Sequence, residues 1–94
     1  MRTIERSSAF KRDFKRVKAA PRHRNDLDSL VSTVVARLVS DQVLPNKNRD
    51  HGLSGDWAGY RECHIKPDLL LNYSKPGAGT LRLARLGSHS ELFG

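Results

Sequence analysis

The spacing of apolar residues predicts a helix near the start of the chain. Phe10, Phe14 and Val17 recur at i, i+4 and i+7, which places them on one stripe of a helix. The serines just before them can cap its first turn. Pro21 closes the helix, because a proline ring cannot continue the helical hydrogen-bond ladder. Before it, residues 2–6 are expected to form a short first strand.

A second helix is predicted from Asn25 or Asp26, both good capping residues, to about Ser40. Its apolar positions repeat at helical spacing and define one buried face. They are Leu27, Leu30, Val31, Val34 and Leu38. We expect the two helices to form an antiparallel hairpin.

The pattern changes to a period of two from Tyr60 onward, which is typical of strands. Strands are predicted over residues 60–65, 69–73 and 80–86, joined by tight turns that contain proline or glycine. Residues 45–59 are rich in Pro, Asn and Gly and are interpreted as a long loop.

The predicted fold class is therefore α+β, with the order β-α-α-β-β-β. We expect an antiparallel sheet with the helical hairpin on one face and the other face open. Ninety-four residues suit a single domain spanning residues 1–94.

The charge of the chain narrows the choice of partners. The formal net charge is +7, and lysines and arginines crowd the first quarter of the sequence. Such a surface attracts RNA, DNA, ribosomes, anionic membranes or acidic proteins. No apolar run approaches the roughly 20 residues that span a bilayer, and the N-terminus lacks a signal-peptide core. We expect a cytoplasmic protein without membrane attachment.

The single cysteine, Cys63, is interpreted as a small buried apolar residue.

Three histidines lie in polar contexts in the second half of the chain, and imidazole can take and give protons near neutral pH. RNA is cleaved without a metal when one group deprotonates the 2′-hydroxyl, another protonates the leaving 5′-oxygen, and a cation steadies the phosphorane. Candidates for these roles are His51, His64, Asp68 and His89, with Arg85 or Arg61 as the cation. No cofactor is expected.

Other interpretations of the same residues stay open. The histidines are also compatible with an ordinary surface, and together with Asp68 they have the ligand chemistry of a zinc site, although close-spaced pairs are absent. Trp57 and Tyr60 are suited to stacking on bases or to packing in a core. The basic face of the first helix is either solvated or grips phosphates.

Two segments carry a family resemblance. Residues 50–68 read DHGLSGDWAGYRECHIKPD and resemble the pattern D-H-x-L-x-G-x-W-x-G-Y-R-x-x-H-x-x-P-D of the YafQ subgroup of RelE/ParE-superfamily toxins. Residues 85–94 read RLGSHSELFG and are similar to that subgroup's R-x-G-x-H-x-x-L-F-G. The first half of the chain agrees with the subgroup in layout rather than in distinctive residues.

The resemblance implies a RelE-like fold and a type II toxin that cleaves messenger RNA at the ribosome. It implies a cognate antitoxin, expected to bind through an acidic segment. It places acid–base roles on His51, His64, Asp68 and His89, with His51 or His64 favoured as base and His89 as acid. Arg85 would stabilise the phosphate. The subgroup often has a glutamate before this arginine, where Ala84 stands here, so substrate preference stays open.

The expected RNA contacts combine loop cations, helix cations and aromatic side chains. They are Lys47, Arg49, Arg61, Trp57, Phe93, Lys11 and Lys15. The competing hypothesis is a RelE/ParE-fold binding module without nuclease activity, which binds gyrase or an antitoxin. The histidine set discriminates between the two, because a binding module has no need of it.

Overall fold

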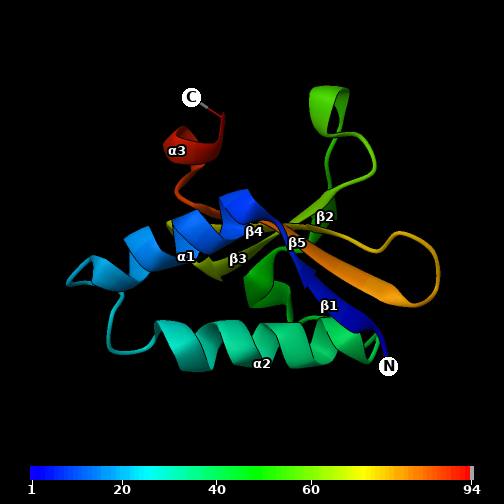
Figure 1. Ribbon diagram of the computed structural model, residues 1–94, viewed down its shortest axis with the longest axis horizontal. Helices are drawn as coiled ribbons and strands as arrows, with labels where there is room; N and C mark the ends of the chain where they lie inside the picture. The colour runs from blue at the N-terminus through cyan, green and yellow to red at the C-terminus, as the bar shows by residue number, and fades with distance from the viewer. Residues whose placement is uncertain (94) are drawn as a thin grey trace.

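The computed structural model describes residues 1–93, so the final Gly94 of the predicted tail motif lies outside them. The elements are β1 (Thr3–Arg6), α1 (Ser8–Ala19), α2 (Leu27–Val39), η1 (Asn46–Asn48), β2 (His51–Gly52), η2 (Gly55–Trp57), β3 (Arg61–Lys66), β4 (Leu69–Ser74), β5 (Thr80–Gly87) and α3 (His89–Phe93), where η denotes a 3₁₀ turn. Figure 1 shows α1 and α2 as an antiparallel pair joined at one end. The α+β class and the predicted order of the main elements are confirmed.

The sheet differs from the prediction in two respects. Its strand order is β1-β5-β4-β3-β2, and β1 pairs with β5 in parallel, so the sheet is mixed rather than antiparallel. Both helices and the strands β2 to β4 separate β1 from β5 in the sequence, so no tight hairpin turn requires these two neighbours to be antiparallel. The additional strand β2 lies inside the predicted loop and pairs with β3 over two residues. Two residues are too few to show a period-two pattern.

Local chemistry explains where the helices begin. The side chain of Ser7 accepts a hydrogen bond from the Phe10 N–H at 2.9 Å and caps α1 as predicted. Asp26 precedes α2 but makes no capping hydrogen bond. Its carboxylate pairs instead with the ammonium group of Lys66 on β3, at 2.8 Å. The interaction ties the start of α2 to the sheet.

The core fills the space between the helices and one face of the sheet. Both helices contribute their predicted stripes, and the sheet contributes residues that alternate along β3 and β4 and, apart from one register shift, along β5. Those from the sheet are Cys63, Ile65, Leu69, Leu71, Tyr73, Leu81, Leu83 and Leu86. The alternation of β3 is thus as predicted, with Cys63 and Ile65 facing the helices. None of the helices in residues 1–93 has the length and apolar character needed to cross a bilayer.

The second face of the sheet is not open, contrary to expectation. Glu62, Leu70, Asn72 and Ser74 point to this face and are all buried. Figure 1 shows α3 and the segment containing η2 on the side of the sheet away from α2. These short elements cover part of the face. With three and five residues, they are too short to show a periodic pattern in the sequence.

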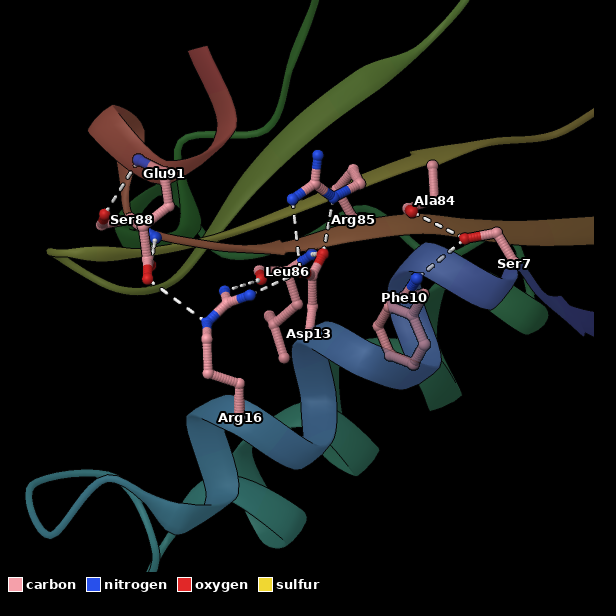
Figure 2. A network of polar contacts seen from close by, with 9 residues as sticks. All are labelled: Ser7, Phe10, Asp13, Arg16, Ala84, Arg85, Leu86, Ser88 and Glu91. Carbon is pink, nitrogen blue, oxygen red and sulfur yellow. Dashed lines mark hydrogen bonds and ion pairs between the residues drawn. The ribbon is translucent and has the colours of Figure 1, made fainter. Parts of the chain in front are cut away.

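A row of side chains from α1 completes the edge of β5. The strand β1 ends at Arg6, opposite Leu83, so beyond Leu83 the edge of β5 away from β4 has no strand beside it. Ser7 donates to the Ala84 carbonyl at 2.7 Å, and Arg16 donates to the Leu86 carbonyl at 3.2 Å. The carboxylate of Asp13 accepts from the Leu86 N–H at 3.0 Å (Figure 2). The helix thereby supplies the partners that a strand would otherwise give.

The central strand makes a quantitative prediction about stability. Leu71 lies on β4 and is fully buried, so Leu71→Ala removes packed methyl groups and leaves a cavity. We expect the free energy of unfolding to fall by about 2–5 kcal/mol in urea denaturation. Val43→Ala is the control, because Val43 is 87% exposed and its truncation should change stability by about 0.5 kcal/mol or less. A loss below about 1 kcal/mol for Leu71→Ala would contradict this packing.

The buried thiol gives a second prediction. Cys63 is fully buried, and burial raises the pKa of its thiol to about 12. Only the thiolate reacts with alkylating reagents, so the native protein should resist iodoacetamide at pH 8. Denaturant restores an ordinary pKa and exposes the sulfur, and the reaction should then be complete. Rapid alkylation of the native protein, followed by mass spectrometry, would show the burial to be wrong.

Candidate functional site

Strand register places four chemically useful residues in one row across the sheet. His51 on β2 lies opposite Glu62 on β3, Glu62 lies opposite Asn72 on β4, and Asn72 lies opposite Arg85 on β5. Neighbouring strands are about 4.8 Å apart, so the row spans about 14 Å. Residues 34 positions apart in the sequence therefore share one line.

The beginning of this row pairs an imidazole with a carboxylate. The Nε2 atom of His51 lies 3.6 Å from Oε1 of Glu62. At this distance the two side chains form an ion pair when the imidazole is protonated. The other ring nitrogen, Nδ1, lies 2.7 Å from the carbonyl of Arg49 and is its natural donor. Nε2 of the neutral ring then carries the lone pair, and it lies on the side of Glu62.

His64 has the same local arrangement on the next strand. Its Nδ1 lies 3.2 Å from the Pro67 carbonyl across the β3–β4 turn. The carbonyl of His64 itself accepts a hydrogen bond from the Asn48 side chain at 2.7 Å. The first contact assigns the proton to Nδ1 and leaves Nε2 as the acceptor. In both predicted bases, therefore, Nδ1 bonds to a backbone carbonyl and Nε2 is the nitrogen that can accept a proton.

The end of the sheet brings His64 toward His89. His64 lies opposite Leu70, and Leu70 lies opposite Gly87, so His64 and Gly87 are two strand spacings, about 10 Å, apart. His89 begins α3 two residues after Gly87 and is exposed. The two histidines thus belong to the same end of the sheet.

Asp68 lies in the β3–β4 turn at this end, but its carboxylate has another partner. It pairs at 3.0 Å with the guanidinium of Arg22, from the turn between α1 and α2. Both side chains are more than half exposed. An exposed ion pair of this kind is weak and breaks readily, so the carboxylate stays accessible.

Aromatic contacts join α3 to the segment before β3. The ring of His89 lies 5.2 Å from that of Phe93, and Phe93 lies 6.0 Å from Trp57, edge to face. Trp57 in turn meets Tyr60 at 5.2 Å. Trp57 and Phe93, both expected to stack on RNA, pack against each other here. Leu92 is buried and anchors α3, while Phe93 remains 37% exposed.

Arg85 ends the row in a fixed orientation. Its Nε and Nη2 atoms donate to the two oxygens of Asp13, at 2.6 and 3.2 Å. The hydrogen bond to this carboxylate raises the pKa of the guanidinium above its ordinary value. Figure 2 shows the remaining nitrogen, Nη1, directed away from α1. The cation is therefore held from one side, and its side chain is 28% exposed on the other.

The predicted RNA contacts do not form one surface. Lys47 and Arg49 are exposed at η1, next to His51, whereas Arg61 pairs with Asp50 at 3.3 Å. Lys11 and Lys15 are exposed on α1, and Lys11 borders the groove between the helices. At 100° per residue, both lie on the opposite side of α1 from Asp13. They are therefore remote from Arg85.

Two residues of this region were missed by the sequence interpretation. Glu62 is 5% exposed and shares the face of His64, which the period-two pattern already indicated. Asp13 is the single acidic residue in an otherwise basic helix, and that exception was the available signal.

Among residues 1–93, no three His, Cys, Asp or Glu side chains gather closely enough to hold a metal ion, so the zinc alternative has no ligand cluster here.

Comparison with known proteins identifies the family. Residues 2–94 match the family described as "Bacterial toxin of type II toxin-antitoxin system, YafQ". The chain is 37% identical to the mRNA interferase toxin YafQ of Escherichia coli K12 over 99% of its own length and 97% of that protein's.

Solved structures agree with this match. The E. coli DinJ–YafQ complex contains a chain of 33% identity with a TM-score of 0.84, each chain being covered completely. A metal-bound toxin from Helicobacter pylori is 48% identical, with a TM-score of 0.86 over 99% of this chain and 100% of that one. The sequence match, the mixed five-stranded sheet and the spaced histidine motifs lead to one conclusion: the chain belongs to the YafQ family of bacterial toxins of type II toxin–antitoxin systems.

Proposed function

We propose that this toxin cleaves messenger RNA at the ribosome by metal-independent acid–base catalysis and so inhibits translation. Membership of the YafQ family, whose E. coli relative is an mRNA interferase, makes the chain an endoribonuclease. The observation that carries the mechanism is the row in which His51 and Arg85 lie at the two ends of one line across the sheet.

The proposed reaction needs no group beyond those of the chain and the RNA. Nε2 of His51 or His64 accepts the proton of a ribose 2′-hydroxyl, and the 2′-oxygen attacks the adjacent phosphorus. The bond to the 5′-oxygen breaks, and an acid returns a proton to that oxygen. The products are a 2′,3′-cyclic phosphate and a free 5′-hydroxyl.

The structure supports a division of labour among these residues. His51 and His64 both have Nδ1 against a backbone carbonyl, which favours them as bases. His89 is exposed at the start of α3 and suits the acid. Arg85 supplies the cation that stabilises the negative phosphorane, and one such donor typically contributes about 10²–10³-fold in rate.

Ribosome dependence follows from how loosely such a site holds RNA. The proposed proton-transfer groups come from β2, β3 and the start of α3, and His51 and His89 are exposed. In-line attack requires the reacting atoms to be aligned, which is worth up to roughly 7–11 kcal/mol. A messenger RNA already held by the ribosome supplies this alignment, and the basic residues of α1 can contact ribosomal RNA.

A cognate antitoxin is the proposed protein partner. The E. coli relative is found in a complex with the antitoxin DinJ. In this chain an apolar groove of about 720 Å³ runs between α1, α2 and β1. Its apolar lining includes Ile4, Phe14, Val31 and Val35, and Arg6 and Lys11 lie at its border. An antitoxin segment with apolar and acidic residues would complement this surface.

Loss of the histidines is the primary test. We expect His64→Ala and His89→Ala each to reduce mRNA cleavage by about 10²–10⁴-fold, because each removes one proton-transfer group. Expression of either variant should no longer arrest bacterial growth. Thr33→Ala on the exposed surface of α2 is the control and should arrest growth like the wild type. If both folded histidine variants arrest growth fully, the chain acts as a binding module and the nuclease mechanism is wrong.

Chelation tests the absence of a metal. Cleavage of RNA should persist after EDTA has removed transition metals and magnesium alone has been added back in excess for ribosome integrity. Proton transfer by imidazole requires no Lewis acid, so the rate should change by less than about 3-fold. Loss of cleavage on chelation followed by rescue with zinc would instead establish metal-assisted hydrolysis.

A further inference from the structure

Asp13 is a buried charge whose placement calls for a functional explanation. The residue is 3% exposed and is the single acid within α1. Removing a carboxylate from water is costly unless charges and hydrogen bonds compensate for it. The described residues give it that compensation in full, from three different side chains or backbone groups.

The two oxygens of Asp13 accept four hydrogen bonds. Oδ2 accepts from Nε of Arg85 at 2.6 Å and from the Leu86 N–H at 3.0 Å. Oδ1 accepts from Nη2 of Arg85 at 3.2 Å and from Nη1 of Arg16 at 2.8 Å. Figure 2 shows the carboxylate between these groups, beneath β5. Burial acts to raise the pKa of Asp13, but the hydrogen bonds outweigh it and hold the pKa below its ordinary value.

The pairing uses only one edge of the Arg85 guanidinium. The Nε and Nη2 atoms face Asp13, and Nη1 points away from α1 (Figure 2). A guanidinium offers a second edge, formed by Nη1 and the outer hydrogen of Nη2, which matches two oxygens of a phosphate. Arg85, which carries this free edge, is the last residue of the row, and His51 is the first.

We propose that Asp13 is a positioning residue for RNA cleavage: it holds the guanidinium of Arg85 in one orientation, with its free edge presented to the scissile phosphate. This inference rests on the proposed nuclease function. Asp13 does not touch the RNA, and it acts through Arg85. An arginine without such a partner samples many rotamers, and transition-state stabilisation depends on donors that are already in place.

The charge of Asp13 can be removed by mutation while the shape of its side chain is kept. Asp13→Asn has the same shape but no charge, and its amide nitrogen faces a donor instead of accepting from it. Ser7→Ala is the matched control, because it removes another contact between α1 and β5, together with the cap of α1, without touching Arg85. A purely structural role of Asp13 predicts that both variants affect activity only through stability.

The experiment is a double-mutant cycle on cleavage of a defined mRNA in a reconstituted translation system. We expect Asp13→Asn to lower kcat by about 10–100-fold with KM changed by less than about 3-fold, and Arg85→Ala to lower kcat by about 10²–10³-fold. The double variant should match Arg85→Ala within about 3-fold, because Asp13 has no role once Arg85 is absent. Ser7→Ala should retain wild-type kcat.

A second variant keeps the test informative if Asp13→Asn does not fold. Arg85→Lys preserves the positive charge but cannot form two parallel hydrogen bonds, and it leaves Asp13 in place to accept from Leu86. We expect its kcat to fall by at least about 10-fold, with thermal unfolding showing a folded protein. Wild-type kcat for Arg85→Lys would overturn the inference, because orientation of the planar group would then be irrelevant.

The outcomes separate this inference from the nuclease mechanism. Losses that multiply in the double variant, or an Asp13→Asn variant with the kcat of Ser7→Ala, overturn the positioning role alone. If Arg85→Ala and the histidine variants all cleave like the wild type, the proposed catalytic mechanism fails as well.

Discussion

The edge of β5 is the constraint on which the arrangement of this protein depends. The strand β1 covers only its first half, and the exposed backbone of the second half must find hydrogen-bond partners. Side chains of α1 provide them, with Asp13 bonded to the Leu86 N–H and Arg16 to the Leu86 carbonyl. The same strand carries Arg85, so the contacts that complete the sheet also orient a charged group of the candidate site.

This arrangement explains why a buried carboxylate is compatible with stability. Burial of Asp13 disfavours its charged form, but four hydrogen bonds favour it more strongly, and its pKa lies below the ordinary value. A carboxyl with a lowered native pKa stabilises the folded state above its unfolded pKa, near 4, and loses that contribution as the pH falls through the lower value. At neutral pH the carboxylate of Asp13 is fully ionised. Its hydrogen bonds between α1 and β5 therefore make their full contribution to stability at the pH at which the toxin is expected to act.

Much of the fold could be predicted from the sequence because its elements are periodic. The stripe from Phe10 to Val17 and the alternation around Cys63 each depend on neighbouring residues only, and both are confirmed. The parallel pairing of β1 with β5 was missed, because Ile4 and Leu81 become partners only through the tertiary fold. The two-residue strand β2 is too short to produce a pattern.

The candidate site follows the same rule. The spaced motifs indicated the histidines through a family resemblance, whereas the ion pairs that decide how each charge is held join distant segments. Asp13 and Arg85 are 72 positions apart in the sequence, and Asp68 forms its ion pair with Arg22, from the turn between the two helices. No local pattern encodes such partners. A lone acid in a basic helix, however, is a signal that the sequence does contain.

The second face of the sheet shows how a small domain can hold a reactive surface. Oε2 of Glu62 and both amide atoms of Asn72 are buried among the described residues without a hydrogen-bond partner. Such groups lower stability, and in folded proteins they are uncommon unless another molecule satisfies them. Both lie in the row between His51 and Arg85. The described residues cover these atoms, so the middle of the row lacks the hydrogen bonds that hold Arg85 at its end.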